Sequence, residues 1–531
     1  MKKEWQKFKL YLFVLSFVCV GTLFFFWYHL DYLFTTLEPE SMMWYKFSQF
    51  QDKPYYEFIY LFLSIGFVIS FAQFLPEKIK DRIKIMIHLP KKISTILFSH
   101  LIIGTLFVFL ISFVVSAILV FIIYNYYPDV ILSIVVKDMF FYTIASVIIY
   151  LFSSAVILEK NPLVAFLKFI LGLFFLFLFV KNEFTTSDII WLVLLGFIPF
   201  LALDSLRSMK QQRLQSKLFY GVIIFVVLLI GFKTYKAYEK KYQKDFSKYY
   251  IFYSNSVNDF VYQKNYGDHN FEYGIKEKKT FDQYEYESYL PFVYWKNLDI
   301  QKKLPVIIAQ KIYTKEQIKN SRLSFNYHPR YLKKQELQLY PFFNPLKDKG
   351  MIPFPEEMFS PTKNKFVVYN YDDGVSKELT KQINETLVKN NVMFPIQNVW
   401  GKATNMKPFD QGYIIEDMNN NLFNLKRADN KITVRKIEYP KGIKIRYIRI
   451  SENKQKNLTG YAIDTKNGFY ILTWDFKFIK LDLPEFKYEK MRLKIISNPI
   501  NYLIRFSDDK NYYGVVYDKK FQKIKEIHFD K

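Results

Sequence analysis

Residues 77–92 read EKIKDRIKIMIHLPKK and separate two long apolar runs. The segment carries six Lys and Arg residues among its sixteen positions and ends in Leu-Pro followed by two lysines. Short loops that are rich in Lys and Arg stay on the cytoplasmic side of a membrane. The sequence therefore predicts two membrane-spanning helices joined by a basic, amphipathic cytoplasmic segment.

The apolar runs are numerous enough for a polytopic membrane domain. A helix needs about 20 largely apolar residues to cross a bilayer. We expect about seven spans, within a range of six to eight, because seven stretches meet or approach that length. They cover residues 10–30, 57–75, 101–124, 139–158, 163–180, 189–203 and 218–232. The bulky residues Trp27, Tyr28 and Tyr32 after the first run suit an interfacial anchor better than a signal-peptide cleavage site.

The loops between these runs predict an orientation. With seven spans, the strongly basic segments 1–9, 77–92 and 206–217 all fall on one side. That side is the cytoplasm, so the N-terminus is expected there. An odd number of spans then places the C-terminal half outside. We expect a multi-pass protein of the cytoplasmic (inner) membrane with an extracytoplasmic C-terminal domain.

The basic segment also carries a recognisable pattern. Its basic start, its helical stretch 83–89, Pro90 and the following apolar run with His100 resemble the cytoplasmic coupling loop of type-2 ABC exporter permeases. The resemblance covers roughly the first 235 residues. It implies a permease-like helical domain at 1–235, a separate ABC ATPase as partner, and a homo- or heterodimer of permease subunits. The candidate coupling residues are Arg82, Lys84, His88, Pro90, Lys91 and Lys92. The alternative is a solvated loop without a partner.

The chain contains no motif for energy conversion or catalysis. A phosphate-binding loop requires G-x-x-x-x-G-K-[ST], which the sequence lacks. It also lacks G-x-S-x-G, and His269, His328 and His528 do not have metal-ligand spacing. We therefore expect no enzyme activity, no catalytic residue, no metal and no cofactor.

Few polar residues interrupt the apolar runs. His100, Lys168 and Asp204 each lie within two turns of a predicted cytoplasmic end, so we expect their side chains to snorkel to the interface. The formal net charge of +25 is spread over both halves of the chain and does not form a basic patch. A nucleic-acid partner is therefore not expected, whereas the lipid bilayer is.

The C-terminal half is predicted to fold outside the bilayer as a mainly β domain with some helix. A stalk at 236–250 leads into a mixed α/β region at 251–405 and antiparallel β repeats at 406–531. Apolar residues at intervals of four predict a helix at 376–389. They are Val375, Leu379, Ile383 and Leu387.

Segments 412–437, 460–483 and 504–527 share one plan of three strands and two turns, which indicates a propeller-like or meandering sheet. We expect Asp417, Asp464 and Asp509 to form the first turn of each segment. Strand alternation further predicts that only one of Leu422 and Phe423 is buried.

Residues 394–426, FPIQNVWGKATNMKPFDQGYIIEDMNNNLFNLK, contain a Lys-Pro-x-Asp-x-Gly-Tyr run followed by an Asp and a Leu-Phe strand. This pattern is similar to a functionally uncharacterised domain of bacterial membrane proteins, whose members commonly join it to a permease-type membrane half. The resemblance covers most of 240–531 and implies an architecture more than an activity. The motif residues are Lys407, Pro408, Asp410, Gly412, Tyr413 and Asp417. The alternative is a tight turn that enters the β region.

Two functions remain open. The first is a permease-like subunit of an ABC-type transport system that works with a separate ATPase and binds substrate or a partner with its outer domain. The second is a non-transporting membrane scaffold or sensor whose β-rich domain recognises an envelope component.

Overall fold

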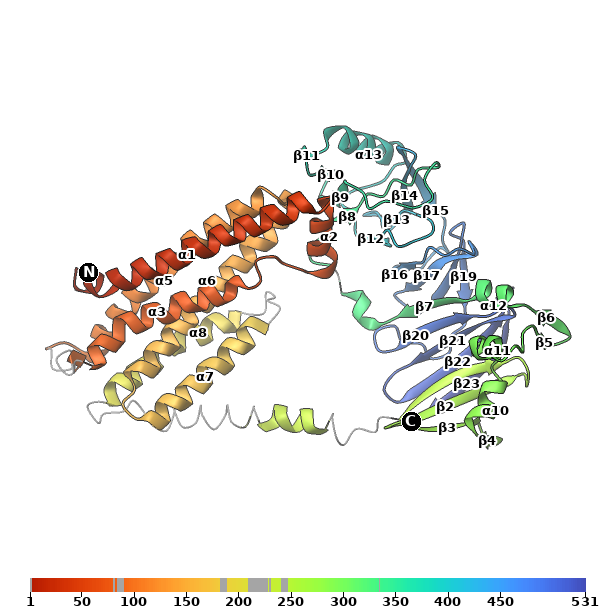
Figure 1. Cartoon of the computed structure of the whole chain (residues 1–531), viewed down its shortest axis with the longest axis horizontal. Helices are drawn as coiled ribbons and strands as arrows, with labels where there is room; N and C mark the ends of the chain where they lie inside the picture. Colours follow the sequence, from red (N-terminus) through yellow and green to blue (C-terminus); the bar gives the residue numbers. More distant parts are fainter. Residues whose placement is uncertain are drawn as a thin grey trace. The chain divides into compact units, whose positions relative to one another are not determined.

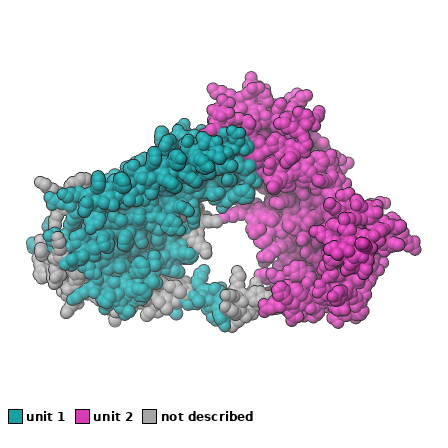
Figure 2. All heavy atoms as spheres, viewed as in Figure 1, with its two compact units in different colours: residues 1–241 teal, residues 242–531 magenta. Residues whose placement is uncertain are grey.

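The computed structural model describes residues 2–79, 82–83, 90–181, 189–208, 228, 231–239, 247–333 and 335–531. The chain divides into two compact units, residues 1–241 and 242–531 (Figure 2). Unit 1 is helical and unit 2 is mainly β (Figure 1). The two fold types are those expected from the apolar runs of the N-terminal half and the strand patterns of the C-terminal half.

The described helices of unit 1 include five that are long and apolar enough to cross a membrane. The unit contains α1 (Lys2–Thr36), α2 (Ser41–Phe50), α3 (Phe58–Ile79), α5 (Ile93–Tyr124), α6 (Asp129–Leu158), α7 (Pro162–Lys181) and α8 (Ile189–Ser208). The shorter α2 and the Pro199-containing α8 are not among the five. The expected count of about seven spans is therefore not confirmed, and most of the predicted span 218–232 lies outside the described residues.

Small and polar residues let α3 and α6 pack closely. A Cβ at Gly66 would lie only 2.0 Å from the Ser146 main-chain oxygen, so glycine is required for this approach. Further along the same interface the Ser70 and Ser154 hydroxyls lie 3.1 Å apart. Hydrogen bonds between helices satisfy polar groups that would otherwise be costly in an apolar environment.

Unit 2 consists of successive antiparallel sheets (Figure 1). The first sheet is β1 (Lys248–Ser254), β2 (Asp259–Gly267), β3 (Asn270–Ile275) and β4 (Lys279–Phe281), and the second is β8 (Tyr340–Pro341), β9 (Met358–Pro361), β10 (Phe366–Asn370) and β11 (Gly374–Val375). The third is β12 (Asn398–Gly401), β13 (Tyr413–Glu416), β14 (Leu422–Ala428) and β15 (Lys431–Ile437).

The fourth sheet is β16 (Ile445–Ile450), β17 (Leu458–Asp464), β18 (Phe469–Thr473) and β19 (Phe478–Leu481). The fifth combines β20 (Arg492–Ser497), β21 (Asn501–Ser507), β22 (Asn511–Asp518) and β23 (Lys523–Asp530) with β7 (Leu323–Tyr327), in the order β23-β22-β21-β20-β7. A separate hairpin joins β5 (Val306–Ile308) to β6 (Lys311–Tyr313).

Short helices complete unit 2. They are α10 (Gln283–Ser288), α11 (Trp295–Ile300), α12 (Lys315–Ser321), the 3-10 helix η3 (Pro329–Leu332) and α13 (Lys377–Lys389). The helix predicted at 376–389 is α13, which begins after Ser376 and buries Ile383 and Leu387. Val375, the first of the four apolar residues at intervals of four, lies instead in β11, where its side chain is 36% exposed.

The sheets are stacked with a separate apolar core between each neighbouring pair. One core joins the second sheet, α13 and the third sheet, and the next joins the third and fourth sheets. Two more cores lie between the fourth and fifth sheets and between the fifth and first sheets. The third, fourth and fifth sheets are therefore packed on both faces.

The repeated segments have the three strands expected, and each sheet gains a fourth strand from the preceding residues: β12, β16 and β20. Asp417 Oδ1 accepts the Asn421 N–H at 2.8 Å, and Asp464 Oδ1 accepts the Gly468 N–H at 2.7 Å, so both form turns as predicted. In the third segment Asp508 has this role. Its Oδ1 accepts the Asn511 N–H at 2.7 Å, so the assignment of this turn to Asp509 was wrong.

The expected burial of only one residue of the Leu422–Phe423 pair was also wrong. The exposed fractions are 0% for Leu422 and 1% for Phe423. Phe423 packs in the core toward the second sheet and Leu422 in the core toward the fourth. The side chains of β14 do alternate between the two faces of the sheet. Because both faces are covered, side chains of either orientation are buried.

Substitution at these positions tests the stacked arrangement. We expect Leu422→Asp and Phe423→Asp each to lower the unfolding temperature of the full chain strongly. The lost apolar burial alone costs about 2–5 kcal/mol, and an unpaired buried carboxylate adds to that cost. Lys436→Asp, at an exposed position of β15, is the control and should have little effect. If only one of the two core substitutions lowered the unfolding temperature, packing on both faces of the sheet would be contradicted.

Candidate functional site

Within the basic segment the structure describes residues 77–79, 82–83 and 90–92. Arg82 is exposed and its neighbour Ile83 is 2% exposed, while Pro90, Lys91 and Lys92 are exposed immediately before α5. The remaining predicted coupling residues, Lys84 and His88, lie outside the described residues. Four of the six candidates therefore lie on an accessible surface next to the ends of α3 and α5.

The end of α3 that leads into this segment is held by charged contacts. Glu77 Oε1 lies 2.8 Å from the Lys7 Nζ of α1, and the Lys78 Nζ donates to the Glu159 main-chain oxygen at 2.8 Å. Glu159 follows the last residue of α6. The first two residues of the basic segment thus connect α3 to both α1 and α6.

Glu159 is also part of a buried ionic cluster. The Lys168 Nζ lies 2.9 Å from Glu159 Oε2 and 3.0 Å from Asp204 Oδ2, and it donates to the Ser205 Oγ at 2.6 Å. The side chains of Lys168 and Glu159 are 0% exposed and that of Asp204 is 7% exposed. The cluster joins α7, the end of α6 and α8.

The snorkelling interpretation of Lys168 and Asp204 is therefore wrong, because their charges are neutralised by each other and by Glu159 inside the helix bundle. Removing one partner of such a pair leaves an unpaired buried charge, at a cost of about 3–5 kcal/mol. His100 lies on α5, where its main-chain oxygen accepts the Gln73 Nε2 at 2.9 Å. Glu159 was not predicted from the sequence as a member of this cluster, because Glu159 lies in a short loop between two apolar runs.

In unit 2 the motif residues form a second buried ionic cluster. The Lys407 Nζ donates to Asp410 Oδ1 at 2.6 Å and to Glu452 Oε1 at 3.3 Å, and it lies 4.0 Å from the Phe343 ring centroid. The side chains of Lys407 and Glu452 are 0% exposed. Glu452 Oε1 also accepts the Gln411 N–H at 2.9 Å. This cluster ties the motif loop to the segment after β16.

The other motif residues shape the entry to β13. Gly412 has a φ of +73°, and a Cβ there would lie 2.2 Å from the Leu425 main-chain oxygen. The Tyr413 hydroxyl donates to the Pro341 oxygen at 2.7 Å, and Asp417 forms the β13–β14 turn. Pro408 is exposed. These contacts give the motif a structural role in positioning β13.

Glu452 was not predicted from the sequence, since it lies 45 residues beyond Lys407. Burial, the largest influence, raises the pKa of Glu452 to about 7 against the attraction of Lys407, and the charge of Asp410 raises it further. Its second oxygen, Oε2, is buried and accepts no hydrogen bond from the described residues. One ammonium between two buried carboxylates favours a proton on Glu452.

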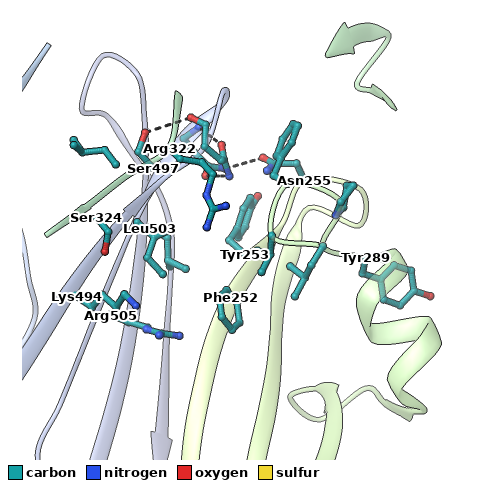
Figure 3. A pocket seen from close by; sticks show the side chains of 18 residues that line it. Phe252, Tyr253, Asn255, Tyr289, Arg322, Ser324, Lys494, Ser497, Leu503 and Arg505 are labelled. Atoms are coloured by element: carbon teal, nitrogen blue, oxygen red, sulfur yellow. Dashed lines mark hydrogen bonds between the residues drawn. The ribbon is translucent and has the colours of Figure 1, made fainter. Parts of the chain in front are cut away.

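A cavity of about 390 Å³ lies in another part of unit 2 (Figure 3). One wall is the face of β7, β20 and β21 that is turned toward the first sheet, and the other is β1 with residues 289–293. This volume is in the range of small-molecule sites. Its apolar lining includes Phe252, Leu290, Phe292, Leu323, Ile496 and Leu503.

Three cationic side chains line the same cavity: Arg322, Lys494 and Arg505. Lys494 and Arg505 are direct cross-strand partners in β20 and β21 (Figure 3). Burial lowers the pKa of Lys494, and the positive charges of Arg505 and Arg322 lower it further. Burial also lowers the pKa of Arg505. The described part of the chain contains no group of three His, Cys, Asp or Glu side chains that could hold a metal.

Comparison with known proteins identifies the class of unit 2. Residues 250–516 match the family described as "Domain of unknown function (DUF4857)". Because the match covers half of the chain, the chain belongs to this family. The expected uncharacterised domain in the C-terminal half is thereby confirmed. No curated protein and no solved structure matches the chain.

The raised pKa of Glu452 leads to a prediction about stability. Between pH 4.5 and about 7 the folded chain holds a proton that the unfolded chain releases. The contribution of Glu452 to stability is therefore fully present below pH 4.5 and is lost as the pH rises toward 7. Glu452→Gln should remove this dependence and gain on the order of 1–3 kcal/mol relative to the native chain between pH 5 and 8.

The unfolding temperature of the full chain across this pH range measures the effect. Glu438→Gln, which changes an exposed carboxylate in the same unit, should leave the pH dependence as it is in the native chain. Parallel pH profiles for Glu452→Gln and the native chain would show that Glu452 is ionised throughout and would contradict the interpretation.

Proposed function

We propose that the protein is a permease-like membrane subunit of an ABC-type transport system that works with a separate ATPase. In this proposal unit 1 crosses the cytoplasmic membrane with its N-terminus inside, and unit 2 lies outside and binds a substrate or a partner. The observation that carries the proposal is the connection between the basic segment and the buried charges of unit 1.

That connection is short and continuous. Lys78 is the second residue of the basic segment, and its Nζ donates to the main-chain oxygen of Glu159. The side chain of Glu159 pairs with Lys168. Lys168 in turn contacts Asp204 on α8. A displacement of the segment by a docked ATPase would therefore act on the ends of α3, α6, α7 and α8 together.

Buried ionic contacts are suited to such transmission. In a low-dielectric interior they are directional, and losing one partner is costly, so intermediate arrangements are disfavoured. Conformational switching requires elements with discrete alternative packings. A second permease subunit, identical or related, would complete the transport unit in this proposal.

A specific observation favours a second candidate function. The cation-lined cavity of unit 2 has a volume and a lining that suit a ligand site, and ligand binding there would require no ATPase. A non-transporting membrane receptor or scaffold that recognises an envelope component would also use it. The two functions differ in whether an ATPase binds to unit 1.

Charge reversal of the basic segment tests the proposal. The triple variant Arg82→Glu, Lys91→Glu and Lys92→Glu changes three exposed cations. We expect it to reduce by at least about tenfold the amount of a P-loop ATPase that co-purifies with the full-length protein from its native membranes, since docking of a basic loop depends on charge complementarity. Quantitative mass spectrometry of the purified complex measures this.

The matched control reverses three exposed lysines of unit 2, Lys431, Lys436 and Lys441, and should retain the ATPase. Retention of the ATPase by the segment variant would contradict the coupling role. A native protein that co-purifies with no P-loop ATPase would contradict the transport function and favour the receptor.

A further inference from the structure

The cations of the cavity differ from the buried cations of the described residues, since Lys494 and Arg505 are half-buried and Arg322 is exposed. Lys168 lies between Glu159 and Asp204, Lys407 contacts Asp410 and Glu452, and Arg427 Nη1 lies 3.0 Å from Glu357 Oε2. Each of these has a carboxylate within 4 Å. Burying a charge is tolerated in proteins when such a partner is present.

Lys494, Arg505 and Arg322 have no carboxylate partner among the described residues. Arg505 Nη1 donates to the Ile251 oxygen at 3.4 Å, and its guanidinium lies 4.9 Å from the Phe252 ring centroid and 5.7 Å from that of Tyr250. Like charges directly opposite each other on neighbouring strands destabilise a sheet. The pair Lys494 and Arg505 is therefore a local cost that a bound anion would offset.

The lining of the cavity limits which anion suits it. Ile496 and Leu503 extend from the same sheet face as the two cations, and Phe252 and Phe292 face them from the opposite wall. A bare inorganic anion would contact the cations but leave these apolar side chains against water. A ligand that combines a compact anionic head with an apolar body would satisfy both.

The position of the two cations suits the head of such a ligand. Lys494 and Arg505 also line a second, wider groove of about 900 Å³. They therefore lie where the apolar cavity meets a polar groove that carries charges of both signs, including Arg492 and Asp508. A head group held there remains hydrated on one side while the apolar body enters the cavity.

We propose that this cavity binds an anionic amphiphile. The carboxylate or phosphate of the ligand lies between Lys494 and Arg505, with Arg322 as the third cation. The apolar body of the ligand packs against Phe252, Ile496 and Leu503. The proposal goes beyond the transport function and holds whether or not an ATPase binds to unit 1. The source of the amphiphile is either the lipid bilayer or a water-soluble aryl phosphate.

Photo-crosslinking of the full-length protein tests the proposal. The probe is a dodecyl phosphate that carries a diazirine in its chain, added to protein in discs of uncharged phosphatidylcholine lipid. Peptide mass spectrometry should locate the label at residues 252–255, 289–293 or 323–324. Lys494→Gln with Arg505→Gln should reduce this label at least about tenfold, which corresponds to about 1.4 kcal/mol, because the double change removes the charge-assisted hydrogen bonds to the head group.

Two further variants separate binding from folding. Lys431→Gln with Arg435→Gln removes two exposed cations from the same unit and should retain the label. Ser324→Trp fills the cavity from an exposed position of β7 while it keeps all three cations, and it should lose the label without a fall in unfolding temperature. Equal labelling of the native chain and the Lys494/Arg505 variant, or label confined to unit 1, would overturn the proposal.

Competition identifies the ligand class. Unlabelled dodecyl phosphate or naphthyl phosphate should displace the probe, and dodecyl maltoside, which is neutral, should not. Stronger displacement by dodecyl phosphate indicates a lipid source, and stronger displacement by naphthyl phosphate indicates a soluble one. Displacement by inorganic phosphate at the same concentration would show a simple anion site and would overturn the requirement for an apolar body.

Discussion

The packing of unit 2 depends on sheets that are buried on both faces. The third, fourth and fifth sheets each lie between two apolar cores, so residues of both orientations on their central strands, such as β17 and β22, are withdrawn from water. Such a stack leaves little room for polar side chains except at strand ends. Asp417, Asp464 and Asp508 are found at those ends, where their carboxylates accept main-chain N–H groups of tight turns.

The same constraint makes each buried charge informative. In unit 1 the ammonium of Lys168 is neutralised by two carboxylates from two other segments, and in unit 2 Lys407 contacts Asp410 of its own loop and the carboxyl group of Glu452. Both clusters connect parts of the chain that are distant in sequence, which suits a role in holding those parts together. The cavity beside β20 and β21 departs from this arrangement, because Lys494 and Arg505 oppose each other without a carboxylate.

Local patterns in the sequence predicted the elements better than their partners. The three-strand segments, the turns at Asp417 and Asp464 and the helix α13 all follow from spacing within a few residues. The fourth strands β12, β16 and β20 were missed because they are short or lie before the repeated pattern begins. Leu422 and Phe423 were misjudged because strand alternation shows which residues share a face but not whether that face is covered.

The long-range features of the candidate sites carried no local signal. Glu452 and Lys407 are separated by 45 residues, and β7 joins β20 across more than 160 residues of chain. Lys494 and Arg505 each occupy a polar position in a strand in which polar and apolar residues alternate. Taken alone, such a position indicates a solvent-exposed face. Their opposition depends on the register of two strands, and the enclosing wall comes from β1 and residues 289–293, far earlier in the chain. The expected count of about seven spans is not confirmed, since five of the described helices are long and apolar enough to cross a membrane and most of the predicted span 218–232 lies outside the described residues.

The central physical claim is that Lys494 and Arg505 repel each other in the unliganded protein and are retained for a ligand. A double-mutant cycle of Lys494→Gln and Arg505→Gln, measured as the unfolding temperature of delipidated full-length protein, tests it most directly. We predict that each single substitution leaves this temperature equal or higher, and that the double substitution gains less than the sum of the two. A lower unfolding temperature for each single variant, with additive effects in the double variant, would show that the cations stabilise the fold and would contradict the account.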